Sequence, residues 1–468
     1  MRKKLRGGAK DAILILALGL TLAAAPALGA HRLTINDVTV VPMTGAGKII
    51  AHARVQIDDS RITAITSAAG SCAAPCLDGH GKWLIPGLTD AHVHIENDRL
   101  AQLFLHLPRK PPVAEDGVFL PYIANGVTQV FDLSAMTETF VQKADIAAGR
   151  VLGPHIITAA MLDGAKPYWP EGMSHGIPNP EAGRQAVRDA HDDGYDLIKV
   201  YSLLDLPTFL AIVDEAKTLG MKVIGHIPGR AQDATAKYLV PGFDAVAHAE
   251  EYAYQTPDYN QARIPGYAAL ARANGTALVT TLTVDDRILE EIEHPESLKQ
   301  RPELVYEYPL LQMMVLYHNP YVAQASPAYI GAQHKITAFN RALVKAFAAA
   351  GVPVLAGTDS PVPGVVPGFA LHDELVALVR AGLTPYQALY ASTTAPCNWL
   401  GTKDCGTVEV GRRADLLLLD GDPIRDIANT NRISAVILGG QVHSAAELAN
   451  KMAALKARNL AALKAAHP

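Results

Sequence analysis

Short runs in which apolar and polar residues alternate stand near both ends of this chain. On the N-terminal side they lie between residues 33 and 65 and are separated by turn residues, a pattern typical of short β-strands. Similar runs return at 414–420 and 433–438. Two short-stranded segments that flank a long middle predict one small β-sandwich, with residues 31–84 as its N-terminal part and residues 401–445 as its C-terminal part.

The long middle, residues 85–400, repeats a different pattern: an apolar run of strand length, a loop and an alanine-rich helical stretch. We count eight strand candidates, which begin at Leu88, Val127, His155, Leu197, Val223, Ala245, Val279 and Val354. Eight β/α units predict the α/β fold class and a (β/α)8 TIM-type barrel. A doubly wound open sheet is the alternative, but no Gly-x-Gly-x-x-Gly fingerprint follows an early strand. Residues 446–468 are rich in Ala, Leu and Lys and predict an exposed amphipathic helix.

Composition fits a large globular protein and argues against a nucleic-acid binder. The 468 residues are 49% hydrophobic and 19% charged, which suits one large α/β domain and a smaller one. The formal net charge is −5, and the chain carries no basic patch beyond its first residues. We therefore expect a small-molecule partner and no nucleic acid.

Residues 1–30 have the composition of an export signal. Five basic residues precede the apolar run from Ala12 to Ala25, and Ala25-Pro26-Ala27 offers a small-x-small cleavage site. Cleavage near Ala27 or Ala30 predicts a periplasmic or secreted protein. The alternative is a permanent membrane anchor, but Gly, Thr and Pro weaken this span. We expect no stable membrane association after cleavage.

The four cysteines form two close couples in the sequence, Cys72 with Cys76 and Cys397 with Cys405. An even number of cysteines in an exported protein fits disulfides. Pairing within each couple is the hypothesis, and buried free thiols are the alternative.

The most informative segment runs from Leu84 to His94, an apolar, β-prone run in which His92 and His94 stand one residue apart. Side chains alternate between the faces of a strand, so the two imidazoles point the same way. Neutral imidazoles on one face make half of a site for a transition metal. If later strands supply more ligands, the chain is a metal-dependent enzyme.

Other strand candidates also end in residues that can serve a metal. Lys199 lies among apolar residues of the fourth strand, His226 and His248 close the fifth and sixth, and Asp359 closes the eighth. Active sites of barrels form at the carboxyl ends of the strands. Each residue has a plainer explanation, since Asp359 can cap a turn and Lys199 can reach solvent. The joint pattern favours a metal centre.

With these residues in view, the chain resembles the amidohydrolase superfamily, which includes imidazolonepropionases, prolidases and related dipeptidases. The matching motifs are Pro86 to His94, Gly357-Thr358-Asp359 and Gly406 to Leu416. The resemblance covers nearly the whole mature chain. It implies a (β/α)8 barrel, a β-sandwich made from both termini and a metal-dependent hydrolase.

The resemblance to the binuclear members also implies roles for the strand-end residues. His92, His94 and Asp359 would hold one divalent ion, and His226 and His248 would hold a second. Lys199 would bridge the two ions after carboxylation by CO2, because burial lowers the pKa of a lysine amine and lets it react. A hydroxide between the ions would attack the carbonyl while Asp359 moves the proton. The histidine-rich set favours zinc, with manganese or cobalt as substitutes.

The expected reaction is cleavage of an amide C–N bond in a dipeptide or an N-acyl amino acid. The alternatives are opening of a cyclic amide, as in imidazolonepropionases, hydrolysis of a phosphotriester or lactone, and a barrel that binds metal without catalysis. Candidate substrate-binding residues are Tyr201, His175, Glu250, Arg230 and His372. Glu250 lies two residues beyond His248 and should share its face.

Two long loops are expected at the same end of the barrel. One follows the third strand and carries Tyr168 and Trp169, and the other runs from Asp285 to about Thr337 and is rich in tyrosine. Such aromatic residues either shape a substrate pocket or pack the loops in place, and the sequence favours neither. The oligomeric state is also open, and a homo-oligomer is one possibility.

Overall fold

The computed structural model describes residues 32–45, 47–68, 70–107, 114–170, 172–229 and 235–466. The export signal predicted for residues 1–30 lies outside these ranges. Within them, no helix combines the length and the apolar character needed to cross a membrane.

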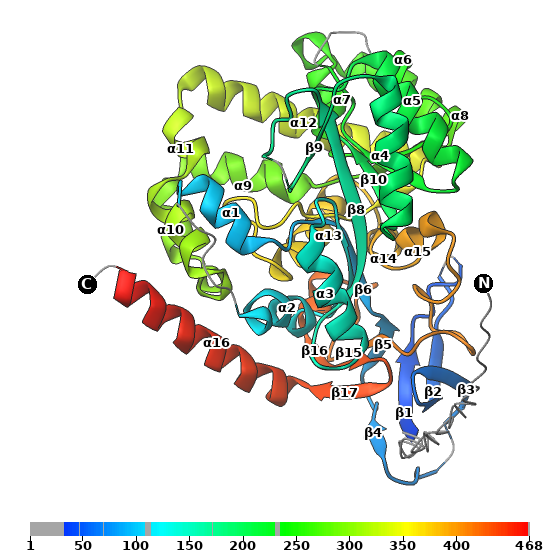
Figure 1. Cartoon of the computed structure of the whole chain (residues 1–468). Helices are drawn as coiled ribbons and strands as arrows, with labels where there is room; N and C mark the ends of the chain where they lie inside the picture. Colours follow the sequence, from blue (N-terminus) through cyan, green and yellow to red (C-terminus); the bar gives the residue numbers. More distant parts are fainter. Residues whose placement is uncertain are drawn as a thin grey trace, which may run out of the picture.

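Strands from both ends of the chain join in one mixed sheet, seen at the lower right of Figure 1. Its order is β17-β16-β15-β5-β1-β2-β3, and β4 pairs with β1. The two ends meet where β15 runs antiparallel to β5, with Leu417 opposite Ile85. The bounds are β1 Arg32–Val40, β2 Ile50–Asp58, β3 Arg61–Ser67, β4 Cys76–Asp78, β5 Trp83–Pro86, β15 Leu416–Leu419, β16 Ile433–Leu438 and β17 Gln441–Ser444.

The middle of the chain forms the barrel, whose parallel strands follow the order β14-β13-β12-β11-β10-β8-β7-β6, with β9 paired to β8. The bounds are β6 Leu88–Val93, β7 Val127–Asp132, β8 His155–Gly164, β9 His175–Ile177, β10 Leu197–Val200, β11 Lys222–Gly225, β12 Phe243–Ala247, β13 Ala277–Val279 and β14 Val354–Leu355. The barrel closes beyond β14, where the N–H of His94 donates to the carbonyl of Ser360 (2.8 Å). The predicted (β/α)8 barrel is confirmed, and each of its eight strands begins within two residues of the predicted start.

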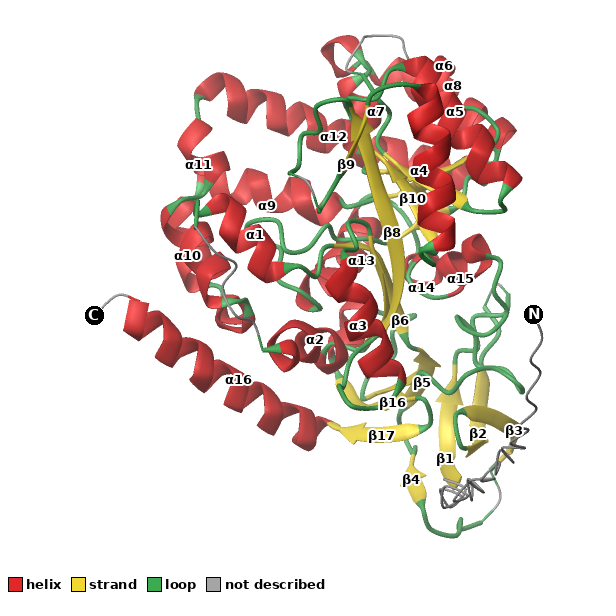
Figure 2. Cartoon of the chain, viewed as in Figure 1, coloured by secondary structure: helices red, strands yellow, loops and turns green. Residues whose placement is uncertain are grey.

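Helices surround the strands of the barrel, as Figure 2 shows. Their bounds are α1 Asn97–Phe104, α2 Glu115–Ala124, α3 Thr137–Ala147, α4 Pro180–Asp192, α5 Leu206–Thr218, α6 Thr235–Tyr238, α7 Glu250–Tyr254, α8 Ile264–Asn274, α9 Leu282–Glu293, α10 Pro309–Tyr317, α11 Pro320–Gln324, α12 Pro327–Ala350, α13 Phe369–Arg380, α14 Pro385–Ala391, α15 Thr394–Leu400 and α16 Ala445–Ala466. Short 3-10 helices cover Pro257–Tyr259, Gln261–Arg263, Pro295–Gln300, Pro302–Tyr306 and Ile427–Asn431.

The long insertion between β13 and β14 carries helices of its own, and the C-terminal helix α16 holds part of it in place. Leu448 and Leu455 of α16 are buried, while the Asn459 amide donates to the carbonyls of Val305 and Glu307, both at 3.0 Å. The predicted C-terminal helix is therefore present, with its apolar side docked against the barrel domain.

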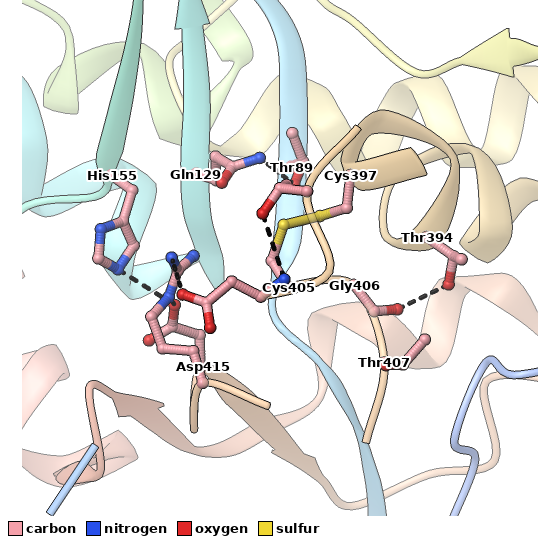
Figure 3. Close-up of a disulfide and its surroundings, with 12 residues drawn as sticks. Thr89, Gln129, His155, Thr394, Cys397, Cys405, Gly406, Thr407 and Asp415 are labelled. Atoms are coloured by element: carbon pink, nitrogen blue, oxygen red, sulfur yellow. Dashed lines mark hydrogen bonds and ion pairs between the residues drawn. A yellow bond between two sulfur atoms is a disulfide. The ribbon is translucent and has the colours of Figure 1, made fainter. Parts of the chain in front are cut away.

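Two features tie the barrel to the terminal sheet near the amino ends of the strands. The first is the disulfide between Cys397 of α15 and Cys405 (Figure 3). The other disulfide, between Cys72 and Cys76, lies within the terminal domain. Beside the first disulfide, the buried carboxylate of Asp415 lies 3.1 Å from Nε2 of His155 and contacts Arg413. Asp415 precedes β15, whereas His155 begins β8, so this ion-pair network crosses between the two domains.

Replacing Asp415 with Asn should lower the free energy of unfolding by about 3 kcal/mol, because it removes the buried carboxylate that His155 and Arg413 share and leaves Arg413 with only its longer contact to Asp404. Burial opposes ionisation, but His155 and Arg413 hold the pKa of Asp415 below its usual value. A carboxylate with a depressed pKa stabilises the fold above its unfolded-state pKa, about 3.9, and loses this effect as the pH falls through the folded-state value. Urea unfolding should therefore show a deficit at neutral pH that shrinks below about pH 4. The control is Asp58→Asn, which removes a half-exposed carboxylate paired with Arg32, and an equal deficit in both variants would contradict the role of Asp415.

Candidate metal centre

Histidine side chains from several strands meet at the carboxyl end of the barrel. His92 lies in β6 and His94 directly follows it, while His226 follows β11 and His248 follows β12. The ring centroids of His92 and His248 are 4.5 Å apart, and those of His226 and His248 are 5.0 Å apart. The structure thus brings together four of the predicted ligands from distant parts of the sequence.

Asp359 completes this cluster from the segment that follows β14. Its Oδ1 lies 3.1 Å from Nε2 of His92 and 3.1 Å from Nε2 of His94. The backbone of Asp359 is left-handed, with φ of 58°, a conformation that a non-glycine residue adopts only where its surroundings enforce it. Asp90 supplies part of that enforcement, because its buried carboxylate accepts from both the N–H (3.0 Å) and the hydroxyl (2.6 Å) of Thr358.

Gly357 explains how the two histidines and Asp359 can come so close. A Cβ atom at this position would meet the Val279 side chain at 2.5 Å and the His92 backbone nitrogen at 3.0 Å. Only glycine allows this approach between β14 and β6. The Gly357-Thr358-Asp359 motif is therefore a packing requirement as well as a source of a ligand.

The arrangement of His92, His94 and Asp359 fits a metal ion. Ligands bound at about 2.0–2.1 Å in a tetrahedral shell lie about 3.3 Å from one another, close to the observed 3.1 Å. Among the described residues, both ring nitrogens of buried His92 lack a hydrogen-bond partner of good geometry, so its contact with Asp359 is close without being a hydrogen bond. Burial and the nearby Lys199 hold the pKa of His92 well below its usual value. A neutral imidazole keeps a lone pair for a metal.

The other histidines are oriented from behind by hydroxyl groups. Nδ1 of His94 lies 2.6 Å from Oγ of Ser134, and Nδ1 of His226 lies 2.9 Å from Oγ of Ser202. Nδ1 of His248 lies 3.0 Å from Oγ1 of Thr281. With Nδ1 engaged, Nε2 is the nitrogen left for a ligand. Sequence reasoning did not identify these serine and threonine partners, since nothing in their local sequence distinguishes them from other strand-end hydroxyls.

Lys199 lies in β10 beside the histidines and is 1% exposed. Burial lowers its pKa to about 8, although the nearby carboxylates of Asp359 and Glu251 oppose this shift. Roughly a tenth of the amine is therefore uncharged at about pH 7, and the uncharged amine is the form that reacts with CO2. These properties agree with the expected carboxylation without testing it.

Tyr201 lies directly beyond β10 with its ring centroid 4.1 Å from that of His226. Nζ of Lys199 is 5.9 Å from the same phenol ring. Burial raises the pKa of Tyr201 well above its usual value, so the phenol keeps its proton and can donate it in a hydrogen bond. Tyr201 is thus placed at the cluster, and its predicted contact with substrate stays a prediction.

Strand alternation, which was the basis for placing Glu250 on the face of His248, does not extend as far as Glu250. The strand β12 ends at Ala247, His248 has a left-handed φ of 78°, and Glu250 begins helix α7. Its carboxylate accepts from the hydroxyl of Tyr254 (2.9 Å). The next residue, Glu251, instead reaches the cluster, where its Oε1 lies 3.0 Å from Nδ1 of His226.

The remaining predicted substrate residues have different positions. His372 is buried in α13, where Nδ1 lies 2.9 Å from Oγ1 of Thr430 and Nε2 lies 3.0 Å from the carbonyl of Asn125. Because Asn125 precedes β7, His372 sits at the opposite end of the barrel, and we no longer retain it as a substrate residue. His175 is exposed on β9. Arg230 lies outside the described residues.

Comparison with protein families places the site in context. The profile described as the Amidohydrolase family matches residues 83–443. An imidazolonepropionase of Deinococcus deserti is 42% identical over 88 residues, which cover 19% of this chain and 22% of that protein. The chain therefore aligns with only about a fifth of this relative. An uncharacterized protein of Mycobacterium tuberculosis is 24% identical over 378 residues, which cover 77% of this chain and 85% of that protein.

Solved structures share the fold over most of both chains. A Xaa-Pro dipeptidase with bound methionine superimposes with a TM-score of 0.67 at 19% identity, covering 88% of this chain and 100% of that one. Bottromycin amidohydrolase gives a TM-score of 0.72 at 19% identity, covering 92% and 90% of the two chains. At these identities the likeness concerns the fold.

Proposed function

Since this chain belongs to the amidohydrolase family, we propose that it is a hydrolase acting on carbon–nitrogen bonds and that it cleaves the amide bond of a dipeptide or an N-acyl amino acid. The observation that carries the proposal is the convergence of His92 and His94 on one carboxylate oxygen of Asp359. That arrangement combines a metal-binding group with a proton acceptor at the mouth of a barrel.

Divalent metal ions are general in this family, and the residues present fit them. We assign His92, His94 and Asp359 to one ion, His226 and His248 to a second, and carboxylated Lys199 to the bridge between them. Zinc is the metal that this histidine-rich set favours. When bound, the ions would lower the pKa of a water molecule between them and polarise the scissile carbonyl.

The protein's own groups then supply proton transfer and orientation. Burial alone would raise the pKa of Asp359, but His92 and His248 hold it well below its usual value, so the side chain is an ionised carboxylate with a free position for a proton. It would take the proton of the attacking water as the C–O bond forms and deliver it to the nitrogen as the C–N bond breaks. The products are a carboxylic acid and an amine.

Tyr201 is the group best placed to donate to the carbonyl oxygen. The side chain of Trp169 hydrogen-bonds the phenol, and an indole N–H can only donate. The phenol oxygen is therefore the acceptor, which leaves the proton of Tyr201 for another acceptor. Glu251, behind His226, would orient the imidazole in the way that carboxylates support metal-binding histidines.

The comparisons support amide hydrolysis over the other reactions. The Xaa-Pro dipeptidase and bottromycin amidohydrolase share the fold, and both names describe amide hydrolases. Opening of a cyclic amide is the second candidate, because the local match at 42% identity is to an imidazolonepropionase.

We also propose that the protein works after export, in the periplasm or outside the cell. The composition of residues 1–30 supports this location. The two disulfides fit it as well, because disulfides persist in oxidising compartments. The expected partner is a small-molecule amide, without nucleic acid or stable membrane association, and assembly into a homo-oligomer is compatible with these features.

Metal analysis and a substrate screen test the proposed function together. Purified protein should hold close to two divalent ions per chain, and the metal-loaded enzyme should hydrolyse members of a panel of dipeptides and N-acyl amino acids. Removal of the ions by a chelator should abolish this activity, and zinc should restore it. A single ion per chain would contradict the binuclear assignment, while turnover confined to cyclic amides would favour the second candidate.

A further inference from the structure

Two large apolar side chains stand exposed next to the candidate metal centre. Tyr168, in the loop after β8, is 70% exposed, and Leu203, in the loop after β10, is 54% exposed. The ring centroid of Tyr168 is 6.4 Å from that of Tyr201, which in turn lies 4.1 Å from that of His226. An exposed apolar surface is thus continuous with the cluster of metal-binding side chains.

A single buried carboxylate ties together the backbones of the two loops that carry these residues. Asp163 is fully buried at the end of β8, and its carboxylate accepts from the backbone N–H of Tyr168 (2.8 Å) and from that of Leu203 (2.7 Å). One carboxylate therefore fixes both loops. A Cβ atom on neighbouring Gly164 would meet the Leu203 carbonyl oxygen at 2.2 Å, so the loops are packed as closely as glycine allows.

Trp169 anchors the same surface to the barrel. Its ring meets that of Tyr168 edge to face at 5.3 Å, and it packs with Tyr201 against a buried cluster that contains Met161, Met173 and Met314. The aromatic side chains offer ring faces and edges to an incoming aromatic group, and the buried methionines pack behind them. The surface is thus firmly supported on one side and open on the other.

We propose that Tyr168, Trp169, Tyr201 and Leu203 form an aromatic platform that binds an aromatic or large apolar group of the substrate beside the scissile amide. This inference rests on the proposed function and narrows it to amides that carry such a group. An apolar surface gains binding free energy when a ligand covers it, and it loses little backbone entropy where the loops that carry it are already held. The platform is continuous with His226 through Tyr201, so the molecule that covers it is the substrate and not another protein.

Three dipeptides provide the test: Ala-Ala lacks an aromatic group, whereas Phe-Ala and Ala-Phe place one on either side of the amide. The metal-loaded enzyme should prefer one of the phenylalanine dipeptides over Ala-Ala by about 10-fold or more in kcat/KM. Tyr168→Ala should remove most of that preference and change kcat/KM for Ala-Ala by less than about 2-fold. Tyr168→Phe should keep it, and Val141→Ala, at an exposed position on α3, is the control for loss of surface apolar area.

Equal losses on all three dipeptides in Tyr168→Ala, or no preference in the unaltered enzyme, would overturn the platform. If none of the dipeptides is hydrolysed although two ions are bound, the proposed function fails. Calorimetry then tests the platform by itself, by measuring how tightly the same dipeptides bind. Tighter binding of a phenylalanine dipeptide that Tyr168→Ala removes would support it, whereas equal binding would overturn it. A dimer that Tyr168→Ala converts to a monomer would instead assign this surface to a second copy of the chain.

Discussion

Replacement of Asp359 by Asn is expected to lower kcat about 10³-fold while leaving the fold intact. Asparagine keeps the size of the side chain and one oxygen, but it cannot accept the proton that a carboxylate accepts. Oδ1 of Asp359 lies 3.1 Å from Nε2 of both His92 and His94, so the proposed proton acceptor is also part of the proposed metal site. Steady-state kinetics of the metal-loaded variant, with metal content measured on the same sample, separates the two roles.

The matched control for this variant is Asp420→Asn, which removes a half-exposed carboxylate paired with Lys82 in the terminal sheet. It should leave kcat unchanged. If Asp359→Asn binds less metal, the rate per bound metal decides the outcome. A fully loaded Asp359→Asn enzyme that keeps more than about a tenth of the original kcat would refute the role of Asp359 in proton transfer.

The positions that sequence reasoning placed well share one physical cause. His92, Lys199 and Asp359 lie in or just beyond buried strands, and parallel strands deliver their carboxyl ends to one side of a barrel. Strand alternation and apolar runs therefore locate such residues without knowledge of side-chain contacts. The eight strands were predictable for the same reason, since most of their residues are buried and apolar.

The residues that sequence reasoning placed wrongly depend on contacts between distant segments. The argument from strand alternation does not apply to Glu250, because the chain turns from β12 into α7 through a left-handed His248, and Glu251 is the residue that contacts His226. His372 fits a pocket residue by type, but Asn125 and Thr430, far away in sequence, bind both of its ring nitrogens. Neither outcome follows from local periodicity.

Loss of Lys199 should be nearly as severe as loss of Asp359, and it should be reversible by chemistry. Lys199→Ala is expected to lower kcat about 10³-fold, because two neighbouring cations would repel each other without an anionic group between them. Acetate or propionate at millimolar concentration should restore part of the activity by supplying a carboxylate in the space that the side chain leaves. The control is Lys222→Ala on the adjacent strand β11, since Lys222 is partly exposed and pairs with Asp244. It should show neither the loss nor the rescue.

The low pKa of Lys199 adds a pH dependence that a purely structural lysine would not show. With a pKa of about 8 in the metal-free protein, roughly 1% of the amine is uncharged at about pH 6 and roughly 90% at about pH 9. Only the uncharged amine attacks CO2, and its proton leaves as the N–C bond forms. Metal-free protein treated with ¹³C-labelled bicarbonate at about pH 9 should therefore show a carbamate carbon by NMR that is absent at about pH 6 and absent in Lys199→Ala. A carbamate signal that persists in Lys199→Ala, or activity in Lys199→Ala that short carboxylates do not raise, would contradict the bridge.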